Sequence, residues 1–209
     1  MPPHRDLAAF ERRAPDYDAG WLGRMHHEIA DRTLSLALAT TAAPQRILDV
    51  GCGTGYLLRR LATFCGDAIV LAGVDPAPAM IEAAKASADD ERLGYSVGVA
   101  EHLPYPDDAF DLVVSTTSFD HWPDQGAGLL ECARVLAPRG RLVLVDQFSS
   151  LLLPTFLMGR AGKARTRSRA DRLLAAAGFG SPTWHDLSAV IIKGVTASMP
   201  AWGARGSPA

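Results

Sequence analysis

The chain has 209 residues, and its 21 Lys and Arg residues nearly balance its 23 Asp and Glu residues, giving a formal net charge of −2. This length suits one domain, which buries about 70% of its unfolded surface. A hydrophobic content of 48% excludes collagen-like and disordered chains. The near-neutral charge argues against a nucleic-acid backbone as the main partner, although it allows a local basic patch.

The apolar segments are too short for membrane insertion. A membrane span requires about 20 apolar residues, and no segment reaches that length. The N-terminal sequence MPPHRDLAAFERRAPDYD has no apolar core of the kind a signal peptide carries. We therefore expect a cytoplasmic protein with no membrane span. The cysteines are odd in number and lack metal-ligand spacing, so we expect neither a disulfide framework nor a metal site; they are Cys52, Cys65 and Cys132.

The pattern of polar and apolar residues divides the first 40 residues into two segments. Residues 1–19 are polar and charged, which predicts a flexible arm or a segment that orders over a ligand. Residues 20–40 predict a helix, because apolar side chains recur at helical spacing between charged ones.

From residue 46 to 147, short apolar runs alternate with helical patterns. The runs are rich in Val, Ile and Leu without polar alternation, which is typical of parallel strands buried on both faces. The predicted strands are 46–50, 69–74, 95–99, 112–115 and 141–145. Helices are predicted over 124–137 and 166–178, with two further strands over 182–186 and 189–195 and a loose tail over 197–209. The pattern predicts an α/β fold: a Rossmann-like doubly wound sheet of seven strands, mostly parallel with an antiparallel last strand, and helices on both faces.

The strongest local signal is ILDVGCGTGYLLRRLA, residues 47–62. Its glycines, Gly51, Gly53 and Gly55, stand between a strand and a helix, where they permit a sharp turn and close approach of a ligand. The following helix directs its N-terminal amides at whatever lies over the loop. About 20 residues later, Asp75 ends the second strand, where a carboxylate can accept from both hydroxyls of a ribose. The alternative is a tight strand–helix turn with no ligand.

The neighbouring residues decide between nucleotide types. A dinucleotide fingerprint needs glycine at its sixth position, where this chain has Tyr56. Asp49 would repel a pyrophosphate but attract a ligand that carries an ammonium and a sulfonium group. S-adenosylmethionine carries both charges and a ribose. A P-loop is excluded because no Gly-Lys-Ser or Gly-Lys-Thr follows the glycines.

Four motifs follow one another in order: DVGCGTG, VDPAPAM, AEHLPYPDDAFDLVVS and RVLAPRGRLVLVD. With them, residues 17–195 resemble the class I S-adenosylmethionine-dependent methyltransferases of the small-molecule, UbiE-like (methyltransferase type 11) branch. The resemblance implies a single methyltransferase domain over residues 1–209. It also implies S-adenosyl-L-methionine as cofactor and S-adenosyl-L-homocysteine as product.

The resemblance implies a set of cofactor contacts. Asp49 would hold the methionine ammonium group and Asp75 the ribose diol. Where relatives often carry an acid that reads adenine, this chain has Val99, so Glu101 is the nearest replacement; the alternative is a solvent-facing or turn-capping side chain. Met80 is either an adenine contact or helix core. The full predicted set is Asp49, Gly51, Cys52, Gly53, Gly55, Asp75, Pro76, Met80, Ala100, Glu101, Ser115 and Thr116.

The loop after the fourth strand carries the candidate catalytic residues, because ligands of α/β sheets lie beyond the carboxyl ends of the strands. His121 is suited to general-base work. Asp120 or a nearby carbonyl could orient it; the alternative is that His121 braces the loop. His26 and His27 are weaker candidates for a substrate-side base. Tyr17 resembles an aromatic residue that covers the cofactor in some relatives.

Substrate identity would be set by residues 1–27, the loop 116–124 and a short lid-like insertion over 148–165, with a second subunit, as in a homodimer, as another means of closing the site. We expect a small, hydrophobic acceptor, methylated on a hydroxyl, amine or activated carbon, in secondary metabolism. The basic segment 160–172 leaves an RNA methyltransferase as an alternative, although it lacks interleaved aromatic residues and nucleic acid is a weaker partner. A third alternative is a cofactor-binding protein that does not methylate, such as a regulatory subunit or a cyclase.

Overall fold

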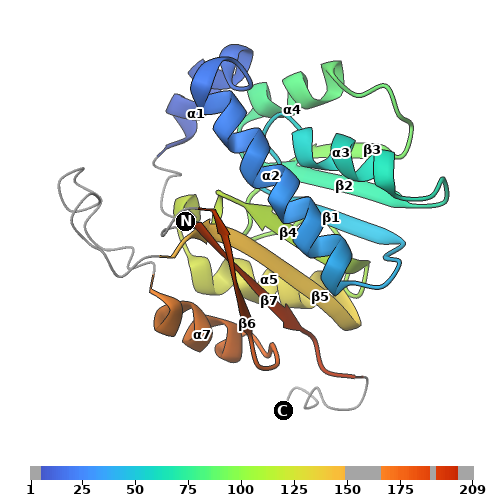
Figure 1. Cartoon of the computed structure of the whole chain (residues 1–209), viewed down its shortest axis with the longest axis vertical. Coiled ribbons are helices and arrows are strands. Elements are labelled where there is room, and N and C mark those ends of the chain that lie inside the picture. Colours follow the sequence, from blue (N-terminus) through green and yellow to red (C-terminus); the bar gives the residue numbers. More distant parts are fainter. Residues whose placement is uncertain (1–5, 149–165, 189–191, 202–209) are drawn as a thin grey trace.

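The computed structural model describes residues 6–148, 166–188 and 192–201. Seven strands form one sheet in the order β3-β2-β1-β4-β5-β7-β6 (Figure 1). Strands β1 to β5 pair in parallel, and β7 is antiparallel to both of its neighbours. The predicted fold class is therefore confirmed. The strands are β1 Arg46–Val50, β2 Val70–Asp75, β3 Leu93–Val97, β4 Phe110–Thr116, β5 Leu136–Gln147, β6 Thr183–Ser188 and β7 Ile192–Ser198.

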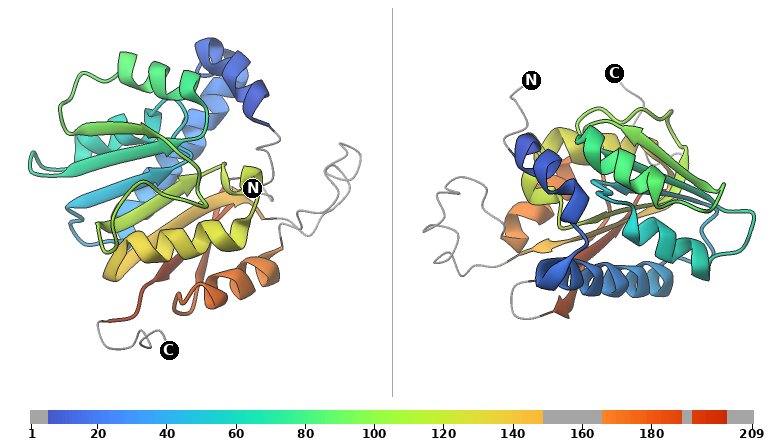
Figure 2. Two further views of the ribbon diagram at one scale, coloured as in Figure 1. Left: turned by 180° about the vertical axis from the view of Figure 1, so that it is seen from behind. Right: turned by 90° about the horizontal axis from the view of Figure 1, so that it is seen from above.

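Helices cover both faces of the sheet. Helices α2 and α3 lie on one face, and α5 and α7 lie on the other (Figures 1 and 2). The bounds of α2 coincide with the range expected from sequence. The helices are α1 Leu7–Arg13, α2 Gly20–Thr40, α3 Tyr56–Phe64, α4 Pro78–Ala86, α5 Gln125–Val135 and α7 Arg167–Ala176, with short 3-10 helices η1 Ala14–Asp16 and η2 Phe119–His121. In the described residues no helix is both long and apolar enough to cross a membrane.

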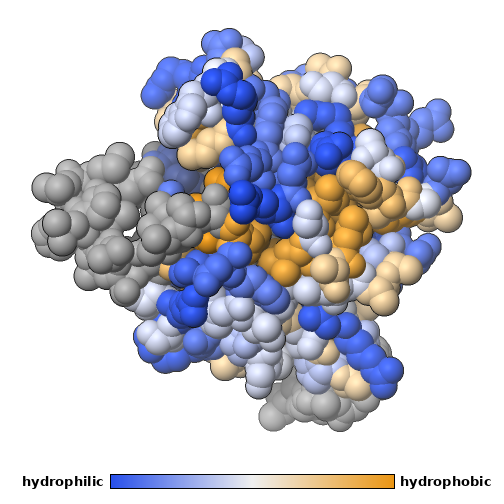
Figure 3. Space-filling view, viewed as in Figure 1, coloured by the Kyte–Doolittle hydropathy of each residue, from blue (hydrophilic) through white to orange (hydrophobic). Residues whose placement is uncertain are grey.

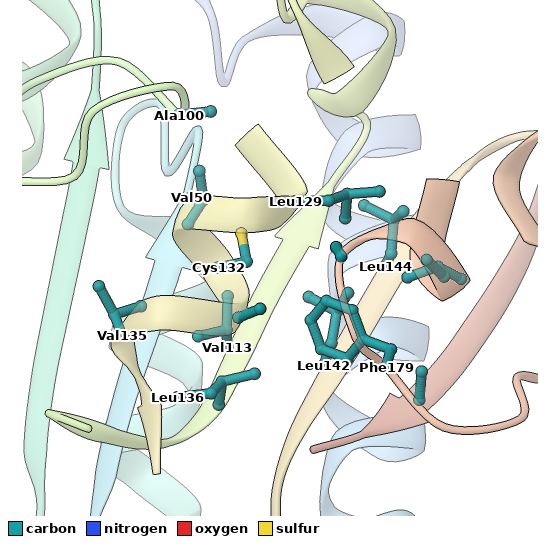
Figure 4. Close-up of a cluster of buried hydrophobic side chains, with 14 of the residues drawn as sticks. Val50, Ala100, Val113, Leu129, Cys132, Val135, Leu136, Leu142, Leu144 and Phe179 are labelled. Atoms are coloured by element: carbon teal, nitrogen blue, oxygen red, sulfur yellow. The ribbon is translucent and has the colours of Figure 1, made fainter. Parts of the chain in front are cut away.

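The side chains of β1 show how the sheet builds two cores. Leu48 and Val50 are buried against the α5–α7 layer, and Ile47 against α2 and α3. Asp49 alternates with Leu48 and Val50, so it belongs to the α2–α3 face. Figure 4 shows the first core, in which Leu129 and Cys132 of α5 meet the strands. Hydrophobic side chains also gather near the middle of the face seen in Figure 3.

Several segments differ from the expected pattern, including residues 197–198 of the expected tail, which end strand β7. Strand β5 begins at Leu136, directly after α5, although the sequence predicted a helix to residue 137 and a strand only from residue 141. A register shift in the β4–β5 pairing between Phe110 and Leu112 accommodates this early start. Near the N-terminus, residues 7–16 of the expected arm form α1 and η1. Residues 149–165 of the expected lid and residues 202–209 of the expected tail lie outside the described residues.

Candidate functional site

The turn between β1 and α3 requires glycine at two positions. Gly51 and Gly55 have φ angles of +79° and +78°, which side chains other than glycine rarely adopt. A Cβ atom at Gly51 would collide with the side chain of Ser118, and one at Gly55 with the hydroxyl of Tyr95. The loop therefore passes too close to its neighbours for any larger residue.

Asp75 is held in place by this loop. Its Oδ2 accepts from the backbone N–H of Gly53 and its Oδ1 from that of Ala77, each at 2.9 Å. Burial raises the pKa of Asp75, and the two N–H donors offset part of that rise. The two bonds fix the carboxylate while each oxygen keeps acceptor capacity for a bound diol.

Asp49 is buried, and one of its carboxylate oxygens lacks a hydrogen bond. Its side chain is 2% exposed, and its Oδ1 has no hydrogen-bond partner. Burial, followed by the charge of Asp75, raises the pKa of Asp49 to about 8. A buried acceptor without a donor is costly, and a ligand ammonium group would supply both the donor and the opposite charge.

Two adjoining chambers share the glycine loop in their walls, and each is lined by one of these acids. The chamber that contains Asp75 is called here the Asp75 chamber, and the one that contains Asp49 is called the Asp49 chamber. Both are open to solvent. Five residues line both, and they are Tyr17, Gly51, Gly53, Thr116 and Thr117. A ligand with a sugar at one end and an amino group at the other can thus reach both acids.

The N-terminal segment forms part of the chamber walls. Phe10 of α1 lines the Asp75 chamber, and Tyr17 lines both chambers. Tyr17 stacks on His26 with ring centroids 5.0 Å apart. Burial, opposed by Arg13 and reinforced by Asp75 and Asp18, raises the pKa of Tyr17 to about 12. Met80 of α4 lines the Asp75 chamber and belongs to the buried cluster that Phe10 and Tyr17 pack against, so it is a core residue, and its contact with adenine stays a prediction.

The end of β4 and the residues after it contribute polar side chains to the chambers. Thr116 lines both chambers, and its buried Oγ1 has no partner. Ser118, which sequence reasoning did not select, lines the Asp75 chamber and is the centre of a hydrogen-bond network. Its Oγ donates to the carbonyl of Val50 at 2.9 Å and accepts from Trp122 Nε1 at 3.1 Å. Ser115 is fully buried and bonds Ser118 Oγ at 2.9 Å, so it supports the site from beneath.

His121 lines the Asp75 chamber together with Trp122. Its Nδ1 is 2.7 Å from Oδ2 of Asp6, at the start of α1. The expected orienting residue, Asp120, is 3% exposed and is not among the chamber-lining residues; its backbone N–H donates to Asp146 Oδ2 at 3.0 Å. Neighbouring residues of a 3-10 helix point in different directions, which separates the two side chains.

The remaining predicted cofactor residues fall into two groups. Pro76 and Ala100 line the Asp75 chamber and Cys52 the Asp49 chamber, where burial raises the pKa of its thiol. Glu101 lines neither: its Oε1 accepts from the N–H of Asp124 at 2.8 Å, before α5. Gly55 also lies outside both linings. Among the described residues, no group of three or more His, Cys, Asp or Glu is placed to hold a metal ion.

Comparisons with known proteins agree with this geometry. A model of the methyltransferase domain family matches residues 48–144. The chain is 37% identical over 188 residues to a malonyl-[acyl-carrier protein] O-methyltransferase of Geobacter sulfurreducens, covering 83% of this chain and 69% of that protein. It spans about half the length of two further relatives, at 34% and 35% identity.

Solved structures share the fold. A chain from the complex between the Haloferax volcanii Trm112 methyltransferase activator and a methyltransferase has a TM-score of 0.77 at 21% identity, covering 91% of this chain and 97% of that chain. Human N-acetylserotonin methyltransferase in complex with S-adenosyl-L-methionine has a TM-score of 0.71 at 17% identity, covering 95% of this chain and 58% of that one.

The chain therefore belongs to the class I S-adenosylmethionine-dependent methyltransferases, and it is an enzyme that uses S-adenosyl-L-methionine. The described residues fit this cofactor, because Asp49 offers an unpartnered buried acceptor for an ammonium group and Asp75 a fixed carboxylate for a diol.

Proposed function

We propose that the chain transfers a methyl group to a hydroxyl, amine or activated carbon of a small, largely hydrophobic molecule, with His121 as the base. The bound cofactor supplies the activated methyl carbon, and the protein supplies alignment and exclusion of water. The position of His121 in the Asp75 chamber, bonded to a carboxylate, is the observation that carries the proposal.

The partner of His121 determines which nitrogen is basic. An ionised carboxylate only accepts hydrogen bonds, so Asp6 favours the tautomer with the proton on Nδ1. Nε2 is then the proton acceptor. Phe10 packs edge-on against the imidazole ring, with centroids 5.0 Å apart, and restricts its rotation. We propose that Asp6 orients the base, whereas Asp120, the residue expected from sequence, does not line the chamber.

A small acceptor is supported by the walls of the site. Phe10, Tyr17 and Trp122 give the Asp75 chamber an aromatic lining. The RNA alternative draws less support, because two arginines of the basic segment are engaged elsewhere. Arg167 is 3.3 Å from Asp186 and lies over the ring of Trp184, and Arg169 bonds Gln125. Residues 160–165 of that segment lie outside the described residues.

The test uses cofactor labelled on the methyl group and a panel of phenols, carboxylic acids, amines and activated-carbon compounds, with bulk RNA in parallel. We expect label in a small hydrophobic acceptor. For a hydroxyl acceptor, His121→Gln should lower kcat about 100-fold or more. The exposed His102 is outside both chambers, so His102→Gln is the matched control. Label in RNA alone, or an unchanged kcat in His121→Gln, would contradict the proposal.

We also propose a cytoplasmic location and a role in secondary metabolism. All three cysteines are free, which suits a reducing compartment. A homodimer remains a proposal, and sedimentation of the purified chain at several concentrations tests it.

A further inference from the structure

Besides the hydroxyl oxygen of Thr116, the Asp49 chamber contains two buried polar atoms that have no partner, and both belong to ionisable side chains. One is Oδ1 of Asp49 and the other is Nδ1 of His26. They come from different elements, β1 and α2, and line the same chamber. One is an acceptor and the other a potential donor, so together they are complementary to a ligand that carries both kinds of group.

The other aspartate and the other histidine of the chamber already have partners. Asp18 Oδ1 accepts from Thr54 Oγ1 at 3.1 Å and is 2.9 Å from His27 Nε2. His27 also stacks on Tyr56, with centroids 3.7 Å apart. Among the described residues no Lys or Arg lines this chamber. A carboxylate entering it would therefore lack the cationic partner that carboxylates most often have in proteins.

We propose that His26 binds the carboxylate of the cofactor's amino-acid end, while Asp49 binds its ammonium group. The amino-acid end is a zwitterion, and the two unpartnered atoms offer one group for each of its charges. Tyr17 holds the imidazole ring in place by stacking on it. His26 is thus a cofactor-binding residue from α2, outside the glycine motif and its acid.

The charge states of His26 and Asp49 add a consequence. Burial, with the charges of Arg13 and His27, lowers the pKa of His26 against the opposing effect of Asp18. Burial and Asp75 raise the pKa of Asp49. Both side chains are therefore neutral near pH 7 before the zwitterion arrives. When it binds, the proton that Asp49 loses is balanced by the one that His26 gains, and the net proton exchange is close to zero.

The first test uses calorimetry to measure the affinity for S-adenosyl-L-homocysteine and for its decarboxylated analogue, which keeps the amine. The quantity compared between variants is the ratio of the first affinity to the second. In the unmodified protein, loss of the carboxylate should weaken binding tenfold or more. His26→Phe keeps the ring that stacks on Tyr17 and removes the nitrogens, so its ratio should fall towards one. His26→Asn, which retains a donor, should restore part of the ratio. Arg13→Gln is the control for a neighbouring cation, because the charge of Arg13 acts on His26. A ratio unchanged in His26→Phe, or lost only in Arg13→Gln, overturns the proposal.

The second test needs no variant and decides the matter if His26→Phe does not fold. Nitrogen-15 NMR of the imidazole should show both nitrogens of His26 protonated with S-adenosyl-L-homocysteine. With 5′-methylthioadenosine, which lacks the amino-acid end, His26 should stay neutral. A neutral His26 in both complexes refutes the proposal. In that case, calorimetry of S-adenosyl-L-homocysteine binding in buffers of different ionisation enthalpy should show that the unmodified protein releases protons. If the proposal holds, the same measurement should show a net proton exchange near zero.

Discussion

Replacing Asp49 by Asn should stabilise the cofactor-free protein while weakening cofactor binding. The folded chain raises the pKa of Asp49 from its ordinary value of 3.8 to about 8. Between those values the folded state keeps a proton that the unfolded state releases. The contribution of this group to the free energy of unfolding therefore falls as pH rises, by about 1.4 kcal/mol for each pH unit. By pH 7 the loss is about 4 kcal/mol.

Asn has nearly the same shape as Asp and cannot ionise. The free energy of unfolding of Asp49→Asn should therefore not fall with rising pH in this way. The variant and the unmodified protein should be about equally stable near pH 4. The variant should become progressively more stable than the unmodified protein towards pH 8, by a few kcal/mol. Urea unfolding at four or five pH values measures the difference. Over the same range, the variant should bind S-adenosyl-L-homocysteine about tenfold or more weakly, because it cannot take the ammonium charge.

Asp111 provides a control of opposite sign. Burial raises its pKa, but the hydrogen bonds and charge of Arg46 outweigh this and lower it. Its stabilising contribution is present at neutral pH and is lost as pH falls below about 4. Asp111→Asn should therefore be less stable than the unmodified protein at pH 7. If Asp49→Asn also loses stability at pH 7, or if its difference from the unmodified protein does not grow with pH, the reasoning about Asp49 is wrong.

Two further predictions concern the glycine loop. Asp75→Ala should weaken binding of S-adenosyl-L-homocysteine by about 1–3 kcal/mol, because the bonds to the ribose are lost; unchanged affinity in calorimetry would remove Asp75 from the site. Gly51→Ala should lower both the melting temperature and cofactor affinity, because it combines a φ of +79° with a collision against Ser118. Gly66→Ala is the control, because a Cβ there meets nothing within 4 Å and its φ is not positive. Equal effects of the two alanines on affinity would exclude the collision as the cause.

The sequence alone determined the fold and the cofactor. Alternating apolar runs and helical patterns fix which faces are buried, and a sheet of this type follows because each strand needs cover on both sides. The glycines and Asp75 are local signals, since they follow two strands that end at the same edge of the sheet. Asp49 was also identified from sequence, because it stands two residues before the first glycine of the loop.

Only the tertiary structure decided which distant side chains join these residues. Asp6 lies 115 residues from His121 in the chain, and no periodicity links the two. His26 shared its helix with His27, and nothing in the sequence distinguished them; packing gave His27 two partners and left Nδ1 of His26 with none. Glu101 was placed near adenine by its position in a motif, yet its carboxylate meets the start of α5. Such pairings depend on how helices and loops pack over the sheet, which local sequence does not specify.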